Sequence, residues 1–131
     1  MVNAGYVGSI DKALEVYRQS KVETASPAEL VLMLYDGCLK SMRRAMQCIA
    51  DKNYSGANES LIRAQDIIDE LRVSLDFSTG EIADSLASVY DFVYSSLVSA
   101  NLKKDPEQVE AAITIMTEIR DGWEEAIRSH A

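Results

Sequence analysis

Two cysteines and one histidine are the side chains in this sequence whose types could support metal or redox chemistry. Cys38 and Cys48 are ten residues apart in a stretch predicted to be one helix, which places them roughly 15 Å apart and too far for a disulfide. The only histidine, His130, lies near the end of the sequence, and there is no Cys-x-x-Cys pair. This pattern does not match a zinc site. The sequence therefore predicts no bound metal, and both thiols are expected to be small buried apolar side chains.

Acidic side chains cluster at two points, and paired carboxylates can serve in acid–base or di-metal chemistry. Asp66, Asp69 and Glu70 form one cluster, and Glu124 and Glu125 form the other. A di-iron bundle needs Glu-x-x-His pairs on two helices, which a single histidine cannot supply. The sequence also lacks a glycine-rich phosphate loop and a nucleophile elbow. We interpret both clusters as solvated helix faces and expect no enzyme and no cofactor, because an active site would have to consist only of carboxylates and tyrosines.

The composition limits the classes of protein that the sequence can encode. The chain has 131 residues, 47% of them hydrophobic, only two prolines and a formal net charge of -8. This length suits one domain with its own core, and the low proline content favours long helices. An acidic balance argues against a nucleic-acid binder. No apolar run approaches the roughly 18 residues that cross a bilayer, and the first residues lack the features of a secretory signal, so we expect a cytoplasmic protein.

The charge is distributed unevenly along the chain. Residues 1–65 carry 8 basic and 7 acidic side chains, a net charge of +1, whereas residues 66–131 carry 5 basic and 14 acidic side chains, a net charge of -9. There is no lysine or arginine between Arg72 and Lys103. The acidic second half is expected to keep an apolar surface soluble and to repel nucleic acid.

Start and stop signals predict two helices in the first half of the chain. Ser26 can cap a helix that has Pro27 at its first position, and Glu29 can complete a capping box. This helix is predicted to end at about Ala50, and a second helix is predicted from residue 54 or 55 to about residue 75.

Two further helices are predicted in the second half. Ser78 and Glu81 form a second candidate capping box, and the helix that follows is predicted to end near Asn101, a residue that tolerates the left-handed C-cap conformation. Asp105 and Pro106 repeat the start signal for a fourth helix that ends at about residue 129.

Apolar periodicity supports an all-α fold. Four helices with short loops predict an antiparallel up-down-up-down four-helix bundle over residues 26–131, preceded by a short helical or extended leader over residues 1–25. The leader is too short for a core of its own and is expected to dock on the bundle, dangle or swap onto a neighbour. The predicted seams follow a three–four spacing: Leu61, Ala64, Ile68, Leu71 and Leu75; Ile82, Leu86, Val89, Val93, Leu97 and Ala100; Val109, Ala112, Met116, Ile119, Trp123 and Ile127.

More apolar residues are present than one bundle seam needs. Tyr90 and Tyr94 widen the seam of the third helix, and the start of the first helix, residues 30–35, is apolar on every side. Further apolar residues lie outside the seams: Ile62, Val73, Phe92 and Val98. This excess favours a groove for a partner. Two other interpretations are that the leader covers the surface, or that both tyrosines belong to the core with their hydroxyls at its edge.

Four segments resemble the FliS family of flagellar secretion chaperones. Residues 22–30, Val-Glu-Thr-Ala-Ser-Pro-Ala-Glu-Leu, and residues 33–37, Met-Leu-Tyr-Asp-Gly, resemble the family signature. Parts of residues 63–71, 86–101 and 123–126 resemble its later helices in the same order, and the likeness covers residues 13–128. The chain departs from the family in its leader, where the family usually has two tyrosines three residues apart: Tyr17 matches the second, but Leu14 stands at the first.

The resemblance implies a cytoplasmic export chaperone that binds the disordered C-terminal segment of flagellin, prevents its premature polymerisation and delivers it to the type III flagellar export apparatus. Export-gate components and other flagellar regulators are further partners consistent with it. The resemblance and the apolar excess together indicate a flagellin groove of Ile68, Leu71, Leu75, Tyr90, Val93, Tyr94 and Leu97, and a lid of Leu14, Tyr17 and Val22. Ile68, Val93 and Leu97 are equally compatible with purely core positions. The alternative function is a non-enzymatic helical scaffold whose apolar surface forms a homo-oligomer.

Overall fold

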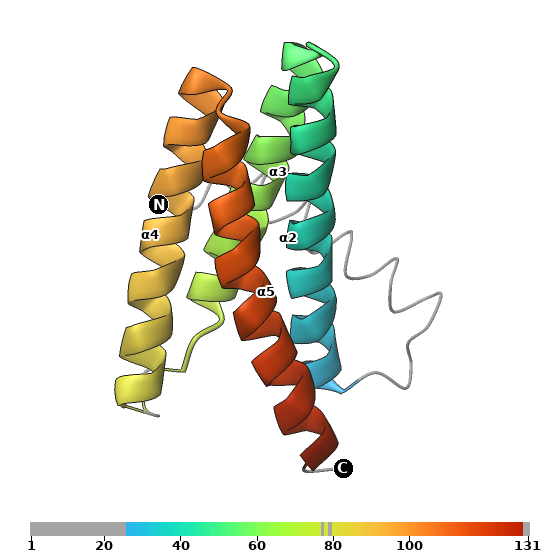
Figure 1. Cartoon of the computed structure of the whole chain (residues 1–131). Coiled ribbons are helices and arrows are strands. Elements are labelled where there is room, and N and C mark those ends of the chain that lie inside the picture. Colours follow the sequence, from blue (N-terminus) through green and yellow to red (C-terminus); the bar gives the residue numbers. More distant parts are fainter. Residues whose placement is uncertain (1–25, 77, 79, 130–131) are drawn as a thin grey trace.

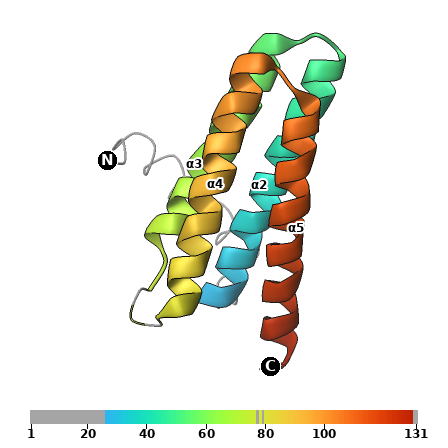
Figure 2. The same ribbon diagram turned by 60° about the vertical axis from the view of Figure 1, so that its left-hand side comes forward.

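Four helices form an antiparallel bundle in the residues that the computed structural model describes, which are 26–76, 78 and 80–129. They are α2 (Pro27–Ala50), α3 (Tyr54–Val73), α4 (Glu81–Lys103) and α5 (Pro106–Ser129). Consecutive helices run in opposite directions, and the α2–α3 and α4–α5 connections lie at the same end of the bundle (Figures 1 and 2). The predicted all-α up-down-up-down bundle is confirmed.

Local capping explains where three of the helices begin. The Ser26 hydroxyl accepts a hydrogen bond from the backbone N–H of Glu29 at 3.2 Å, as predicted for α2. Asp105 Oδ1 accepts one from the N–H of Glu107 at 3.0 Å at the predicted start of α5. Asn53 caps α3 by accepting from the N–H of Gly56 at 3.0 Å.

α4 ends within two residues of its predicted end, but both predicted capping residues of this helix are wrong. Ser78 does not cap α4, because its N–H and hydroxyl both donate to Asp76 Oδ1, at 3.0 and 2.6 Å. The N-cap of α4 is Gly80, which has φ 80° and no side-chain hydrogen bond. Asn101 lies inside the helix, and Lys104 adopts the left-handed C-cap conformation with φ 51°. Lys104 Nζ donates to the Asn101 carbonyl oxygen at 2.7 Å, which helps to satisfy the end of the helix.

All four helices contribute to one apolar core. Most of the predicted seams lie within it or pack against it, but Ile82 is 70% exposed and its assignment to the core is wrong. Ala83 and Ala87 are buried instead, each one residue after a predicted seam residue of α4. Eleven residues separate Ile82 from Val93, which places the two within about 20° of each other around the helix, so helical spacing alone does not account for the exposure of Ile82.

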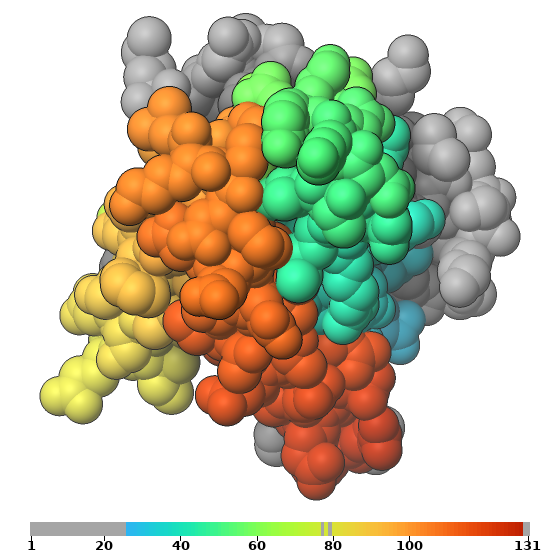
Figure 3. Space-filling model, turned by 45° about the horizontal axis from the view of Figure 1, so that its top comes forward, coloured from blue at the N-terminus to red at the C-terminus, as the bar shows by residue number. Residues whose placement is uncertain are grey.

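The ends of the bundle differ in how they are held. Figure 3 looks onto the end where the start of α3 and the end of α4 lie side by side, and there Asn101 Nδ2 donates to Asn58 Oδ1 at 2.8 Å. At the other end, α5 contributes no fully buried residue, because those of this helix all lie in its first half. Its second half is joined to α2 by Trp123 Nε1, which donates to the carbonyl oxygen of Ala28 at 2.8 Å. Arg120 Nε also donates to Asp36 Oδ1 at 2.7 Å.

None of the helices in the described part of the chain has the length and apolarity needed to cross a membrane.

Candidate functional site

The walls of the candidate groove are α3 and α4, which polar side chains join at two levels. Arg72 of α3 binds Asp91 of α4 with both ends of its guanidinium: Nε lies 2.6 Å from Oδ1 and Nη2 lies 3.2 Å from Oδ2. The Asn58–Asn101 hydrogen bond joins the same two helices nearer the end of the bundle that holds the α2–α3 and α4–α5 connections. These contacts set how the outward edges of α3 and α4 face each other.

A pocket of about 410 Å³ opens between these helices. Apolar and aromatic side chains share its lining with charged groups: Ile68, Asp69, Arg72, Tyr90, Asp91, Tyr94 and Ser95. Such a mixture suits a ligand that is partly apolar and carries a polar or charged group.

Exposed apolar side chains flank the pocket along both walls. They are Ile62 (43% exposed) and Val73 (62%) on α3, and Val98 (38%) and Leu102 (84%) on α4. Ile62 follows Asn58 by four residues and Val98 follows Ser95 by three, so helical spacing places both on the edges that line the groove. The prediction that Ile62, Val73 and Val98 lie outside the core is confirmed.

The sequence-predicted groove residues fall into two groups: Ile68, Tyr90 and Tyr94 line the pocket, whereas Leu71, Leu75, Val93 and Leu97 are not part of its lining. Leu71, Val93 and Leu97 are at most 1% exposed and belong to the core. Leu75 and Tyr94 are half-buried and pack against it. Helical periodicity alone did not separate the inner face of α4 from its groove edge.

Tyr90 belongs both to the pocket lining and to the core. Its hydroxyl forms a buried hydrogen bond with the hydroxyl of Tyr35, across the bundle from α4 to α2. The two side chains are 2% and 1% exposed. Burial raises the pKa of both hydroxyls, so both stay neutral. The hydroxyl of Tyr90 therefore lies inside the core, in contrast to the edge position considered for it.

The pocket lining carries two carboxylates, Asp69 and Asp91, against one cation, Arg72, and the sequence analysis missed this because it interpreted Asp69 as part of a solvated helix face. Hydrogen bonding to Arg72 lowers the pKa of Asp91. Burial, together with the charge of Asp69, raises the pKa of Asp66 to about 6. Asp66 is not part of the pocket lining, and its Oδ1 is buried without a hydrogen-bond partner among the described residues. The sequence feature that could have indicated a charged groove edge is the spacing of three residues between Asp69 and Arg72, which directly follow the seam residue Ile68.

In residues 26–76, 78 and 80–129, no group of three or more potential metal-ligand residues comes together. Cys38 and Cys48 are free and buried, as predicted for small apolar side chains. Burial raises the pKa of the Cys38 thiol to about 12, and its Sγ donates to the carbonyl oxygen of Ala64 at 3.7 Å. His130 lies outside the described residues.

The predicted lid residues Leu14, Tyr17 and Val22 also lie outside the described residues. The apolar start of α2 is described, and residues 30–34 are half-buried there. No lid contact is therefore used to define the groove.

The fold is that of a flagellar chaperone bundle. A solved structure described as the crystal structure of a flagellar chaperone from bacteria superposes with a TM-score of 0.75 and 20% sequence identity, over 90% of this chain and 97% of that chain. This likeness identifies the fold.

Sequence comparison identifies the family. A family model described as "Flagellar protein FliS" matches residues 10–130. The flagellar secretion chaperone FliS of Bacillus subtilis is 41% identical over 121 residues, which are 92% of this chain and 90% of that protein. The Escherichia coli protein of the same name is 38% identical, over 90% of this chain and 91% of its own length. The chain belongs to the FliS family of flagellar secretion chaperones.

Proposed function

We propose that this protein is a non-enzymatic cytoplasmic chaperone that binds the disordered C-terminal segment of flagellin, prevents its premature polymerisation and delivers it to the flagellar type III export apparatus. The observation that carries the proposal is the α3/α4 groove, where a pocket is flanked by exposed apolar side chains on a chain of the FliS family. A segment that folds as it binds loses conformational entropy, and an extended apolar track can compensate for that loss.

The groove offers a client two kinds of contact. Tyr94, which lines the pocket, supplies aromatic surface. Ile62 and Val98 continue the apolar surface toward the end of the bundle that holds the α2–α3 and α4–α5 connections. Leu71, Val93 and Leu97, which are buried, act on the client only through the shape that they give to the groove. The groove is thus a surface for an extended or helical chain.

Calorimetric titration with a peptide from the C-terminal end of the cognate flagellin tests this function. We expect a one-to-one complex with a protein that is monomeric before the peptide is added. The double variant Ile62→Asn/Val98→Asn should bind about tenfold more weakly, because it removes apolar surface that the client covers. The matched double variant Ile82→Asn/Phe92→Asn should change the affinity less than about twofold, because these exposed side chains of α4 are not part of the pocket lining or of the apolar side chains that flank it. No complex, or a stable oligomer indifferent to flagellin, would contradict the proposal.

We also propose that the leader, residues 1–25, competes with the client for the bundle surface. Deleting residues 1–24 should then tighten binding of the flagellin peptide, because a competing intramolecular contact reduces the apparent affinity. The measurement is the same titration with the shortened chain, with a thermal melt to confirm that the bundle is folded. An unchanged or weaker affinity would contradict the lid.

A further inference from the structure

The groove between α3 and α4 holds more negative than positive charge. Asp69 and Asp91 line the pocket with one cation, Arg72. Arg72 already binds Asp91 through two nitrogen–oxygen contacts. Among the described residues no basic side chain forms an ion pair with Asp69. The α4 wall supplies no lysine or arginine before Lys103, so Arg72, which already binds Asp91, is the one cation of the pocket lining that faces the charge of Asp69.

Asp66 adds a second carboxylate on α3, three residues before Asp69 and four after Ile62, beside the pocket but not part of its lining. Its Oδ1 is buried and has no hydrogen-bond partner among the described residues. Desolvation and the nearby charge of Asp69 raise its pKa to about 6, so the carboxylate is mostly ionised at neutral pH and yet poorly solvated. An unpaired, partly buried charge destabilises the folded state, and a cation placed beside it would relieve that cost.

Apolar side chains lie on both sides of these carboxylates along α3. Ile62 precedes Asp69 by seven residues and Val73 follows it by four. At 1.5 Å of rise per residue, the apolar positions are about 10 Å and about 6 Å from the carboxylate along the helix axis. The groove therefore has an apolar–acidic–apolar order.

We propose that the α3/α4 groove selects a client segment in which one lysine or arginine lies between apolar side chains, with the cation held by Asp69 and Asp66. This rests on the proposed function, because it names the chemistry of the client that the groove accepts. A helical client lying along α3 places its apolar side chains about seven residues to one side of the cation and about four to the other. Charge complementarity then sets the register of the client, and the apolar contacts supply most of the affinity.

Two synthetic peptides test the inference without relying on flagellin. Both carry leucines at the seven- and four-residue positions; one has lysine at the central position and its twin has glutamate. Fluorescence anisotropy with the full chain should show the lysine peptide binding about tenfold more tightly. The double variant Asp66→Asn/Asp69→Asn should reduce that preference to about twofold or less.

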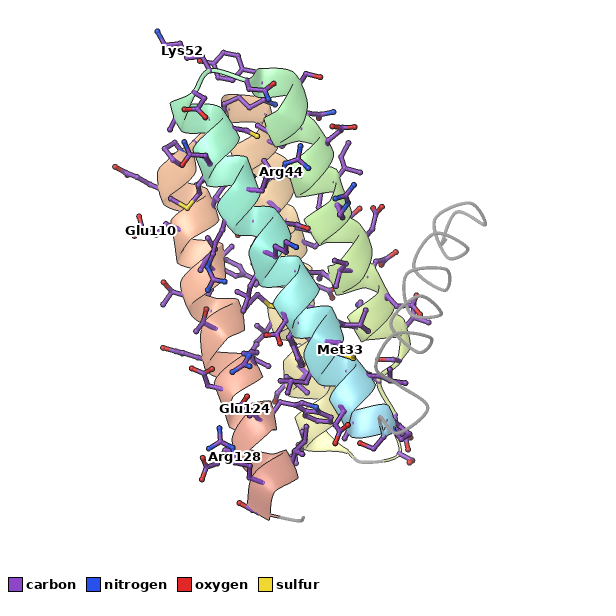
Figure 4. All side chains as sticks on the ribbon, turned by 90° about the vertical axis from the view of Figure 1, so that its right-hand side faces the viewer. Met33, Arg44, Lys52, Glu110, Glu124 and Arg128 are labelled. Carbon is purple, nitrogen blue, oxygen red and sulfur yellow. The ribbon has the colours of Figure 1, made fainter. Side chains whose placement is uncertain are left out.

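A matched control removes the same net charge elsewhere. Glu110→Gln/Glu118→Gln alters two exposed carboxylates of α5; Figure 4 shows Glu110 on the opposite side of the bundle from α3. This control should keep the preference for lysine. Thermal melts verify that each variant is folded, and the single variant Asp69→Asn provides a second measurement if the double variant is not.

Three results would overturn the inference: equal binding of the two peptides, no binding of either, or a preference that survives in the Asp66/Asp69 variant. The flagellin titration on the same preparation decides the proposed function separately. Flagellin binding without a lysine preference would remove the charge recognition and leave the chaperone function. A lysine preference without flagellin binding would contradict the chaperone function and leave the charge recognition in place.

Discussion

Replacing Gly56 by alanine is expected to lower the free energy of unfolding by about 1–3 kcal/mol. A Cβ atom at this position would lie 2.5 Å from Asn53 Nδ2 and 2.9 Å from Cys48 Sγ. Asn53 cannot move aside freely, because its Oδ1 caps α3 through the N–H of Gly56 and its Nδ2 contacts Cys48 Sγ at 3.9 Å. Displacing the cap and the thiol therefore costs more than the roughly 1 kcal/mol that alanine gains over glycine in a helix.

Gly122 provides the matched control for this prediction. It lies in α5, and a Cβ added there would meet nothing within 4 Å. Gly122→Ala should therefore raise the free energy of unfolding by about 0.5–1 kcal/mol through helix propensity alone. Urea unfolding monitored by circular dichroism measures both variants, and opposite shifts of the midpoint are expected. A Gly56→Ala variant as stable as the wild type would show that the turn between α2 and α3 accommodates the methyl group.

The parts of the fold that depend on neighbouring residues were predictable from the sequence. Ser26 and Asp105 each cap the helix that follows, because side chain and backbone meet within three residues. Ser78 does not cap α4, because it donates to Asp76 instead. The sequence pattern does not show which of these two interactions is more favourable. Lys104, a residue type not associated with left-handed caps, ends α4 in place of Asn101. There the long side chain reaches back to the end of the helix, and this depends on its conformation.

The candidate site was predictable only in part, because it depends on which helices become neighbours. Helical spacing placed Ile62, Val73 and Val98 outside the seams, and all three are exposed. The same spacing did not decide whether Val93 and Leu97 face the core or a groove, and they are in the core. The acidic lining arises where the Asp69 edge of α3 meets the Asp91 edge of α4, which no local pattern encodes.

The segments that resemble the FliS signature meet in space, which gives physical reasons for their residue types. Tyr35, from residues 33–37, forms its hydroxyl pair with Tyr90, from residues 86–101. Trp123, from residues 123–126, donates to the carbonyl oxygen of Ala28, from residues 22–30. The motif residues thus join α2 to α4 and to α5. Because Tyr90 also lines the pocket, the tyrosine pair connects the candidate groove to the centre of the core.

Replacing Tyr90 by phenylalanine is accordingly expected to lower the free energy of unfolding by about 1–3 kcal/mol. The substitution preserves the ring and removes the only hydrogen-bond partner that the described residues provide for the Tyr35 hydroxyl. That hydroxyl belongs to a side chain that is 1% exposed. A buried hydroxyl without a partner carries its full desolvation cost. Tyr35→Phe should destabilise the bundle by a similar amount, because it leaves the hydroxyl of Tyr90 in the same condition.

The double variant Tyr35→Phe/Tyr90→Phe distinguishes a hydrogen bond from simple packing. It removes both hydroxyls and leaves no unpaired polar group, so we expect it to be more stable than either single variant and within about 1 kcal/mol of the wild type. Urea unfolding of the four proteins forms a double-mutant cycle, in which the coupling energy should exceed about 1 kcal/mol. Losses that simply add in the double variant would mean that the two hydroxyls do not stabilise each other, and that the aromatic rings alone hold α2 against α4.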